Sequence, residues 1–151
     1  MLIHGQCHCA NIRFDLDWNG DPLAIPARAC DCTFCVKHGG VWTAHAGSTL
    51  SVTIGDGALV SRYEFGTRTA VFHVCTRCGV VPLATSQIDG HLLAVVNVNT
   101  FDDRDALPLQ RTGASFDGED VGSRLARRQR NWIGDVRIVE KGFAPLVDGT
   151  S

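Results

Sequence analysis

Seven cysteines, gathered in three short clusters, constrain this chain more than any other feature. An odd number of cysteines cannot all pair as disulfides, and the first thirty residues lack the basic start and unbroken apolar run of a signal peptide. We therefore expect a protein of the reducing cytoplasm whose thiols bind metal. The clusters are Cys7-His8-Cys9, Cys30-Asp31-Cys32-Thr33-Phe34-Cys35 and Cys75-Thr76-Arg77-Cys78-Gly79.

The third cluster has the C-x-x-C-G pattern of a zinc knuckle, in which two thiolates converge on one ion. Gly79 permits the tight backbone turn that this convergence requires. A redox pair would open a helix, and Val80-Val81-Pro82 does not open one. A structural zinc takes four ligands, and Cys7 and Cys9 can supply the second pair.

The middle cluster is different because Cys30, Cys32 and Cys35 leave no fourth cysteine for their metal. Three protein ligands plus one exchangeable position is the arrangement of a catalytic zinc. The alternative is a closed site in which a histidine or an aspartate supplies the fourth ligand. The candidates for that ligand are His8, Asp31, His38, His45 and His73. With seven thiols divided into four and three, we expect two zinc ions per chain.

Alternating apolar and polar residues predict a mainly β core, antiparallel in its pairing. The alternation is clearest over residues 11–18. Residues 50–54 and 60–65 flank the turn signal Gly55-Asp56-Gly57, and we expect them to pair as a hairpin. The other expected strands are residues 69–74, 92–98 and 135–140.

Helix is scarce, and residues 123–132 are the best candidate because Val121, Leu125 and Trp132 share one face. The arginines of this segment lie largely on the opposite face, and we expect that face to be solvated rather than to bind phosphate. These arginines are Arg124, Arg127, Arg128 and Arg130. Residues 111–122 have no periodicity and are expected to form a loop.

Size and charge narrow the class of protein. A chain of 151 residues with 44% hydrophobic content can pack one core, so we expect a single zinc-binding domain over residues 1–147 and a frayed tail at 148–151. A net charge of -2 gives no general attraction to nucleic acid or anionic lipid. The apolar runs are far shorter than the roughly 20 residues of a membrane helix. We expect neither nucleic acid nor membrane as a partner.

At its cysteine motifs the chain resembles the family of glutathione-dependent formaldehyde-activating enzymes, which also includes centromere protein V. The resemblance runs from about Gly5 to Leu107, and the arginine-rich segment beyond Leu107 matches the pattern less well. The family usually has glycine where Ala10 stands and small residues where Val80-Val81-Pro82 stand, and both departures could alter the pocket wall. The landmarks are Gly5-Gln6-Cys7-His8-Cys9 with Ile12-Arg13-Phe14, Cys30-Asp31-Cys32-Thr33-Phe34-Cys35, Phe72-His73-Val74-Cys75-Thr76-Arg77-Cys78-Gly79, and Val96-Asn97-Val98 with Phe101-Asp102-Asp103.

This resemblance implies a β-tent of folded antiparallel sheets around two zinc sites, with one or two short helices. It implies a structural zinc and a second zinc whose ligands are the catalytic residues. The implied ligands are Cys7, Cys9, Cys75 and Cys78 for the structural zinc, and Cys30, Cys32 and Cys35 for the second.

The activity that the resemblance implies is that of a carbon–sulfur lyase, which joins formaldehyde to the glutathione thiol as S-hydroxymethylglutathione, or reverses that step. Its partner would be a small-molecule thiol or thiol–aldehyde adduct, and an open zinc can polarise an aldehyde or lower the pKa of a thiol. His38 and His8 are the candidate bases. Lys37, Arg68 and Arg77 are the candidate clamps for an anionic substrate.

A non-catalytic zinc module that binds protein partners is the rival reading. A chromatin-binding or microtubule-binding version would be expected to carry a basic or disordered extension. The slightly acidic composition of this chain favours the enzyme.

Overall fold

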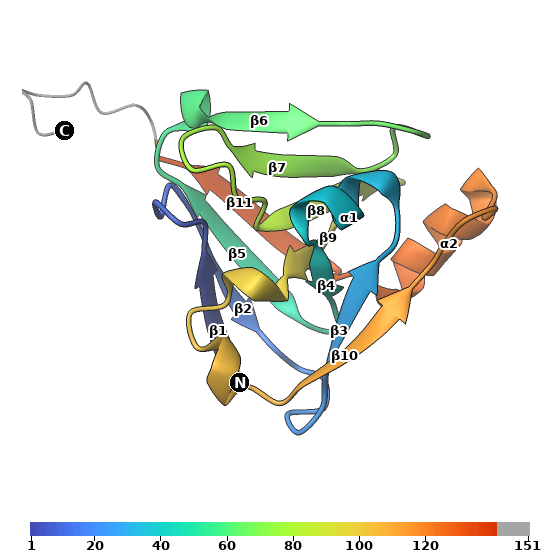
Figure 1. Ribbon diagram of the computed structural model, residues 1–151, viewed down its shortest axis with the longest axis horizontal. Coiled ribbons are helices and arrows are strands. Elements are labelled where there is room, and N and C mark those ends of the chain that lie inside the picture. The colour runs from blue at the N-terminus through green and yellow to red at the C-terminus, as the bar shows by residue number, and fades with distance from the viewer. Residues whose placement is uncertain (142–151) are drawn as a thin grey trace, which may run out of the picture.

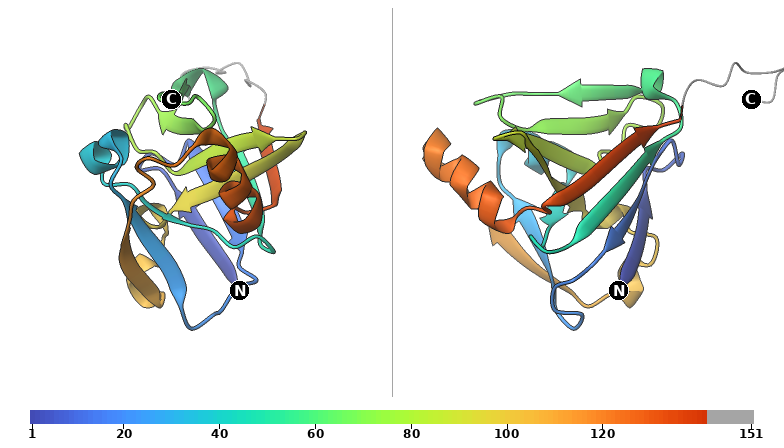
Figure 2. Two further views of the ribbon diagram at one scale, coloured as in Figure 1. Left: turned by 90° about the vertical axis from the view of Figure 1, so that its right-hand side faces the viewer. Right: turned by 180° about the vertical axis from the view of Figure 1, so that it is seen from behind.

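The computed structural model describes residues 1–141, and their strands form two sheets that lean against each other (Figures 1 and 2). The smaller sheet has the strand order β1 (Leu2–Gln6), β2 (Ile12–Asp17), β5 (Thr49–Ile54) and β11 (Asp135–Glu140). The larger sheet has the order β10 (Leu109–Ala114), β3 (Ile25–Cys30), β4 (Val41–Thr43), β9 (His91–Asn97), β8 (Leu83–Ile88), β7 (Val71–Cys75) and β6 (Val60–Tyr63).

Two short α-helices complete the described part of the chain, α1 (Thr33–His38) and α2 (Val121–Asn131). Single 3-10 turns lie at Gly57–Leu59, Val98–Thr100 and Arg104–Ala106. Neither helix has the length and apolar character needed to cross a membrane. The predicted fold class, mainly β with one or two short helices, is confirmed.

The core lies between the two sheets and follows from the alternation in the sequence. In β2, Ile12, Phe14 and Leu16 are buried while the residues between them are exposed. Strand β5 lies beside β2 and repeats this pattern (Figure 2). Ile133, just after α2, is fully buried and bridges to Ala94 of β9, so the end of the helix is fixed to the larger sheet.

The predicted hairpin of residues 50–54 with 60–65 is wrong, because β5 and β6 belong to different sheets. Strand β5 pairs with β2 and β11, and β6 pairs with β7. The Asn11 side chain accepts a hydrogen bond from the Asp56 N–H at 2.9 Å and donates one to the Asp56 carbonyl at 3.1 Å. The Asp56 carboxylate in turn accepts from the Ala58 N–H at 2.9 Å and starts a 3-10 turn. The chain therefore leaves the smaller sheet instead of folding back on β5.

Most strand pairs are antiparallel, as predicted, but β10 runs parallel to β3 and β11 runs parallel to β5. Both are late strands that join an edge of a sheet after a long connection, as parallel pairing requires. Residue alternation does not encode strand direction, so this could not be read from the sequence.

The C-terminal third differs in one element from the prediction. The predicted loop 111–122 begins inside β10, whose side chains are mostly exposed and so give no alternation of apolar residues. The predicted helix is confirmed as α2, where the Asp120 carboxylate accepts from the Ser123 N–H at 2.8 Å. The last strand is confirmed as β11. The predicted tail at 148–151 lies outside the described residues, and the domain limits stay a prediction.

Candidate metal centres and the adjoining cavity

Four cysteines from two distant turns come together where the two sheets meet. Cys7 and Cys9 lie in the turn between β1 and β2, and Cys75 and Cys78 lie at the end of β7. Their sulfur atoms all lie within 4.8 Å of one another. The Cys7 N–H donates to the Ile12 carbonyl at 2.9 Å, and the Gly79 N–H donates to the Cys75 carbonyl at 2.7 Å. These backbone bonds form two knuckles that face each other.

The spacing of the four sulfurs fits a tetrahedral zinc. Sulfurs about 2.3 Å from a zinc at tetrahedral angles lie about 3.8 Å apart. The Cys7 and Cys9 sulfurs are 3.7 Å apart, and the Cys9 and Cys75 sulfurs are 3.4 Å apart. The Cys7 sulfur also accepts a hydrogen bond from the Ile12 N–H at 3.3 Å, the kind of contact that orients a metal ligand. This group could hold a metal ion.

The second group consists of Cys30 at the end of β3, Cys32 before α1 and Cys35 inside α1. The Cys32 N–H donates to the Cys30 sulfur at 3.5 Å, and the Cys35 N–H donates to the Cys32 sulfur at 3.3 Å. The second bond is the N-terminal cap of α1, so the fold of the helix itself orients two of the thiols. These three sulfurs also lie within 4.8 Å of one another and could hold an ion.

The second group favours one thiolate even before metal enters. A hydrogen bond with Cys35 lowers the pKa of Cys30 to about 6. The same bond and burial raise the pKa of Cys35. A divalent cation displaces the remaining thiol protons when it takes three sulfur ligands. The site is therefore prepared for a cation at neutral pH.

None of the side chains considered as a fourth ligand joins the second group within residues 1–141. His73 is buried and its Nε2 lies 2.8 Å from the Thr85 hydroxyl. The His38 ring packs at a tilt against Phe34, with ring centroids 4.4 Å apart. The closed-site alternative therefore finds no support among the described residues.

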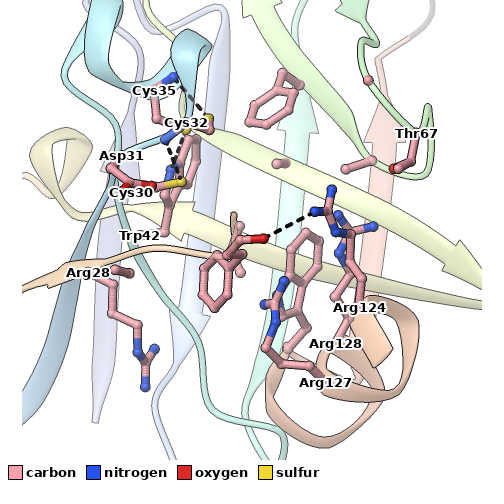
Figure 3. A pocket seen from close by; sticks show the side chains of 18 of the residues that line it. Arg28, Cys30, Asp31, Cys32, Cys35, Trp42, Thr67, Arg124, Arg127 and Arg128 are labelled. Atoms are coloured by element: carbon pink, nitrogen blue, oxygen red, sulfur yellow. Dashed lines mark hydrogen bonds between the residues drawn. The ribbon is translucent and has the colours of Figure 1, made fainter. Parts of the chain in front are cut away.

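A cavity of about 670 Å³ opens beside the second group. All three of its cysteines line this cavity, so a metal held by them would face it (Figure 3). Aromatic side chains form much of the wall, among them Trp42 and Phe72, whose ring centroids are 5.9 Å apart. Ligand cavities of proteins commonly have this size and this apolar lining.

Arginines line the side of the cavity opposite the cysteines (Figure 3). They come from α2, and the expectation that its arginines form a solvated face is wrong for three of the four. The helix packs with this face toward β8 and the loop before the helix, which shields it from water. The three are Arg124, Arg127 and Arg128, and Arg28 of β3 adds a fourth arginine to the lining.

The cavity residues were only partly foreseen from the sequence. The proposed bases His8 and His38 do not line it, and Lys37, Arg68 and Arg77, the proposed clamps, are exposed outside it. Neither Ala10 nor residues 80–82 lie in its wall. Arg28 could have been predicted from the sequence as a neighbour of the cysteine site. Side chains two residues apart on a strand share a face, and Arg28 precedes Cys30 by two.

Comparisons with known proteins give a family and a solved structure that the chain resembles. The profile of the family described as glutathione-dependent formaldehyde-activating enzyme matches residues 2–113. The crystal structure of a Rhodobacter sphaeroides protein is similar to the chain, with a TM-score of 0.50 and 26% sequence identity. That match covers 72% of this chain and 99% of the other. A search among curated proteins gave no match. Helix α2 and β11 lie beyond the residues that the family profile matches.

Proposed function

The chain belongs to the family of glutathione-dependent formaldehyde-activating enzymes, and from this premise we propose that it is a carbon–sulfur lyase. Its substrate would be a thiol–aldehyde adduct such as S-hydroxymethylglutathione, formed from or split into thiol and aldehyde. The reaction would take place where Cys30, Cys32 and Cys35 face the cavity. Its location would be the cytoplasm, where the thiols stay reduced.

The observation that carries this proposal is the placement of the three-cysteine group. The four sulfurs of the other group would satisfy a tetrahedral ion completely, as in a structural site. The three sulfurs supply one ligand fewer, and they lie at the wall of a cavity large enough for a small molecule. The rival function, a non-catalytic zinc module that binds protein partners, gives no role to such a cavity.

The residues around the second group would bind, orient and shield the reactants. Zinc held there would supply a Lewis acid with an exchangeable position, able to lower the pKa of a thiol or polarise an aldehyde. The cavity would hold the thiol sulfur against the aldehyde carbon, so that the carbon–sulfur bond forms while the thiol proton passes to the carbonyl oxygen. Trp42 and Phe72 would exclude water from this end of the cavity.

Exchange spectroscopy by NMR tests the activity directly. Glutathione and formaldehyde equilibrate slowly with their adduct, and the purified zinc protein should accelerate the exchange in proportion to its concentration. Cys32→Ser should lose this acceleration while its circular dichroism spectrum stays that of the wild type. An exchange rate that never exceeds the spontaneous rate would reject the lyase.

Cobalt substitution tests the site without relying on turnover. Visible bands of cobalt respond to a change of ligand, and the closed four-cysteine site should stay silent. Glutathione and then formaldehyde should shift the bands of the wild type but not those of Cys35→Ser. A shift with other thiols but not with glutathione would keep the open site and exclude only this substrate.

A further inference from the structure

We propose that Arg124 and Arg128 of α2 bind a carboxylate of the thiol substrate and thereby select thiols that carry one. From the proposed function this inference takes only that the substrate is a thiol. Both side chains line the cavity across from the three cysteines (Figure 3). A ligand whose sulfur lies at the cysteines would extend toward α2. Helix α2 lies beyond the residues that the family profile matches.

The arginines of this wall outnumber the carboxylates that contact them. Glu119 accepts two hydrogen bonds from Arg127, at 3.0 and 3.1 Å, and one longer bond from Arg124 at 3.4 Å. The Arg127 guanidinium also lies 3.6 Å from the centre of the Phe116 ring. The charge of Arg127 is therefore already paired with Glu119, and the Phe116 ring holds its guanidinium in place. Among residues 1–141, Arg124 has only this shared carboxylate and a weak bond to the Phe116 carbonyl at 3.5 Å.

Arg128 is a buried cation with no carboxylate partner within residues 1–141. Its side chain is only 6% exposed. Its Nη1 donates to three neutral oxygens, the Thr69 hydroxyl at 2.8 Å, the Thr69 carbonyl at 3.0 Å and the Ser86 hydroxyl at 3.2 Å. Its Nε is buried and has no hydrogen-bond partner in the described part of the chain.

Burying such a charge without a counter-charge is costly. Burial, with Arg127 and Arg124 close by, lowers the pKa of Arg128 to about 10, so the group stays a cation at neutral pH. A charge taken out of water costs several kcal/mol unless an anion or further hydrogen bonds offset it. An anionic ligand in the cavity would supply both the counter-charge and an acceptor.

The rest of the lining fits a carboxylate better than a larger anion. Arg28 adds a fourth cation and has no ion pair within residues 1–141. Asp31 and Asp117 also line the cavity, and they would repel the higher charge of a phosphate more strongly. The fork of a guanidinium matches a carboxylate and a phosphate alike, so the two aspartates are what favour the carboxylate. The volume of about 670 Å³ can accept a ligand of tripeptide size.

Calorimetry with two probes that lack a free thiol tests the arginines independently of the lyase. The probes are S-methylglutathione and its diethyl ester, which differ only in their carboxylates. The zinc-loaded wild type should bind the acid about tenfold more tightly than the ester, since a charge-assisted hydrogen bond is worth about one factor of ten. Arg124→Gln and Arg128→Gln should each lose most of this preference. Arg130→Gln is the matched control, because Arg130 lies on the same helix but outside the cavity.

Two further variants separate recognition from folding. Arg128 also ties α2 to Thr69 and Ser86, so Arg128→Lys keeps the charge and should keep part of the preference. Arg124 has weaker contacts, so Arg124→Gln should unfold at the wild-type temperature and give a clean answer. Equal binding of acid and ester by the wild type, or an equal loss in Arg130→Gln, would overturn the proposal. A cobalt spectrum that still responds to glutathione would then leave the proposed lyase intact.

Discussion

The indole Nε1 of Trp42 donates a hydrogen bond to the Cys35 sulfur at 3.3 Å. Cys35 is 2% exposed and Trp42 is 8% exposed, so this contact is closed to bulk water. The bond joins β4 to α1 and fixes the innermost sulfur of the three-cysteine group. Hydrogen bonds to a ligating sulfur orient it and stabilise its negative charge. The tryptophan is thus both a wall of the cavity and a support of the candidate metal site.

Trp42→Phe should weaken metal retention at the three-cysteine site. The ring would still fill the wall, but the Cys35 sulfur would lose its donor. Loss of such a contact typically weakens metal affinity by about 10- to 100-fold. When a coloured chelator takes up the zinc, one of the two ions should therefore leave the variant faster than it leaves the wild type. The other ion should leave at the wild-type rate. Trp132→Phe is the control, because Trp132 lines the same cavity and, among the described residues, donates no hydrogen bond to a cysteine sulfur. Equal retention in both variants would contradict the supporting role.

The number of zinc ions is itself a prediction. The seven thiols form one group of four and one of three, so protein purified without chelator should contain about two zinc ions per chain. Elemental analysis by mass spectrometry measures this. Cys30→Ser should reduce the content toward one ion, whereas one ion or none in the wild type would reject the division.

Cys75→Ser should damage folding far more than Cys32→Ser. Cys75 is fully buried and its group joins the turn after β1 to the end of β7, in different sheets. Because a structural zinc contributes folding free energy outright, we expect a loss of about 3 kcal/mol or more in the free energy of unfolding. Serine at position 32 can still cap α1, as the Cys32 sulfur does now, so its cost should stay within about 1 kcal/mol. Urea unfolding distinguishes the two, and equal losses would contradict the assignment of roles.

The sequence predicted those features that depend on neighbours along the chain. Alternation found β2, where burying one face of a strand is enough to leave a pattern. Cysteine spacing divided the thiols into the groups that the structure brings together. Strand β4 has only three residues, all buried, and β10 is mostly exposed, so neither leaves a periodic signal.

The unpredicted features depend on contacts between distant segments. Residues 50–54 do alternate and residues 60–63 do form a strand, but the Asn11 side chain fixes the turn that separates the two strands. Arg128 lies on the polar face of an amphipathic helix, which normally means solvent. It is buried because oxygens of Thr69 and Ser86, about 60 and 40 residues away in the sequence, accept hydrogen bonds from its guanidinium.

Glu119→Gln should destabilise the protein in a pH-dependent way. The hydrogen bond from Arg127 lowers the pKa of Glu119 below its ordinary value, and this carboxylate is only 17% exposed. A lowered carboxyl pKa stabilises the fold at neutral pH and loses that effect as the pH falls through the folded-state pKa. We expect the variant to be less stable by about 1 kcal/mol at pH 7, with the difference shrinking below about pH 4.3, the ordinary glutamate value.

The difference between variant and wild type is the quantity to follow in that experiment, because acid also removes metal from both proteins. Chemical unfolding at several pH values measures it. Glu64→Gln is the control, since Glu64 is exposed and has no ion pair within residues 1–141. If the difference in the free energy of unfolding between Glu119→Gln and the wild type stayed constant from neutral to acid pH, that would contradict the role of the carboxylate charge.

Ala10→Gly should stabilise the protein. Ala10 follows Cys9 in the first knuckle and has φ of 66°, in the left-handed region that costs a residue with a Cβ about 1–2 kcal/mol. Its N–H donates to the Cys7 carbonyl at 3.0 Å, so the turn holds it in this conformation. This explains why the resemblance marks Ala10 as standing where a glycine is usual. Glycine removes the strain, but it also increases the conformational freedom of the unfolded chain. The free energy of unfolding should therefore rise by about 0.5–1 kcal/mol. Ala106→Gly, at an exposed residue without positive φ, should instead destabilise, and thermal unfolding of both variants with zinc bound measures the contrast. If both glycines lowered the melting temperature equally, strain at Ala10 would not be the reason for the family's glycine.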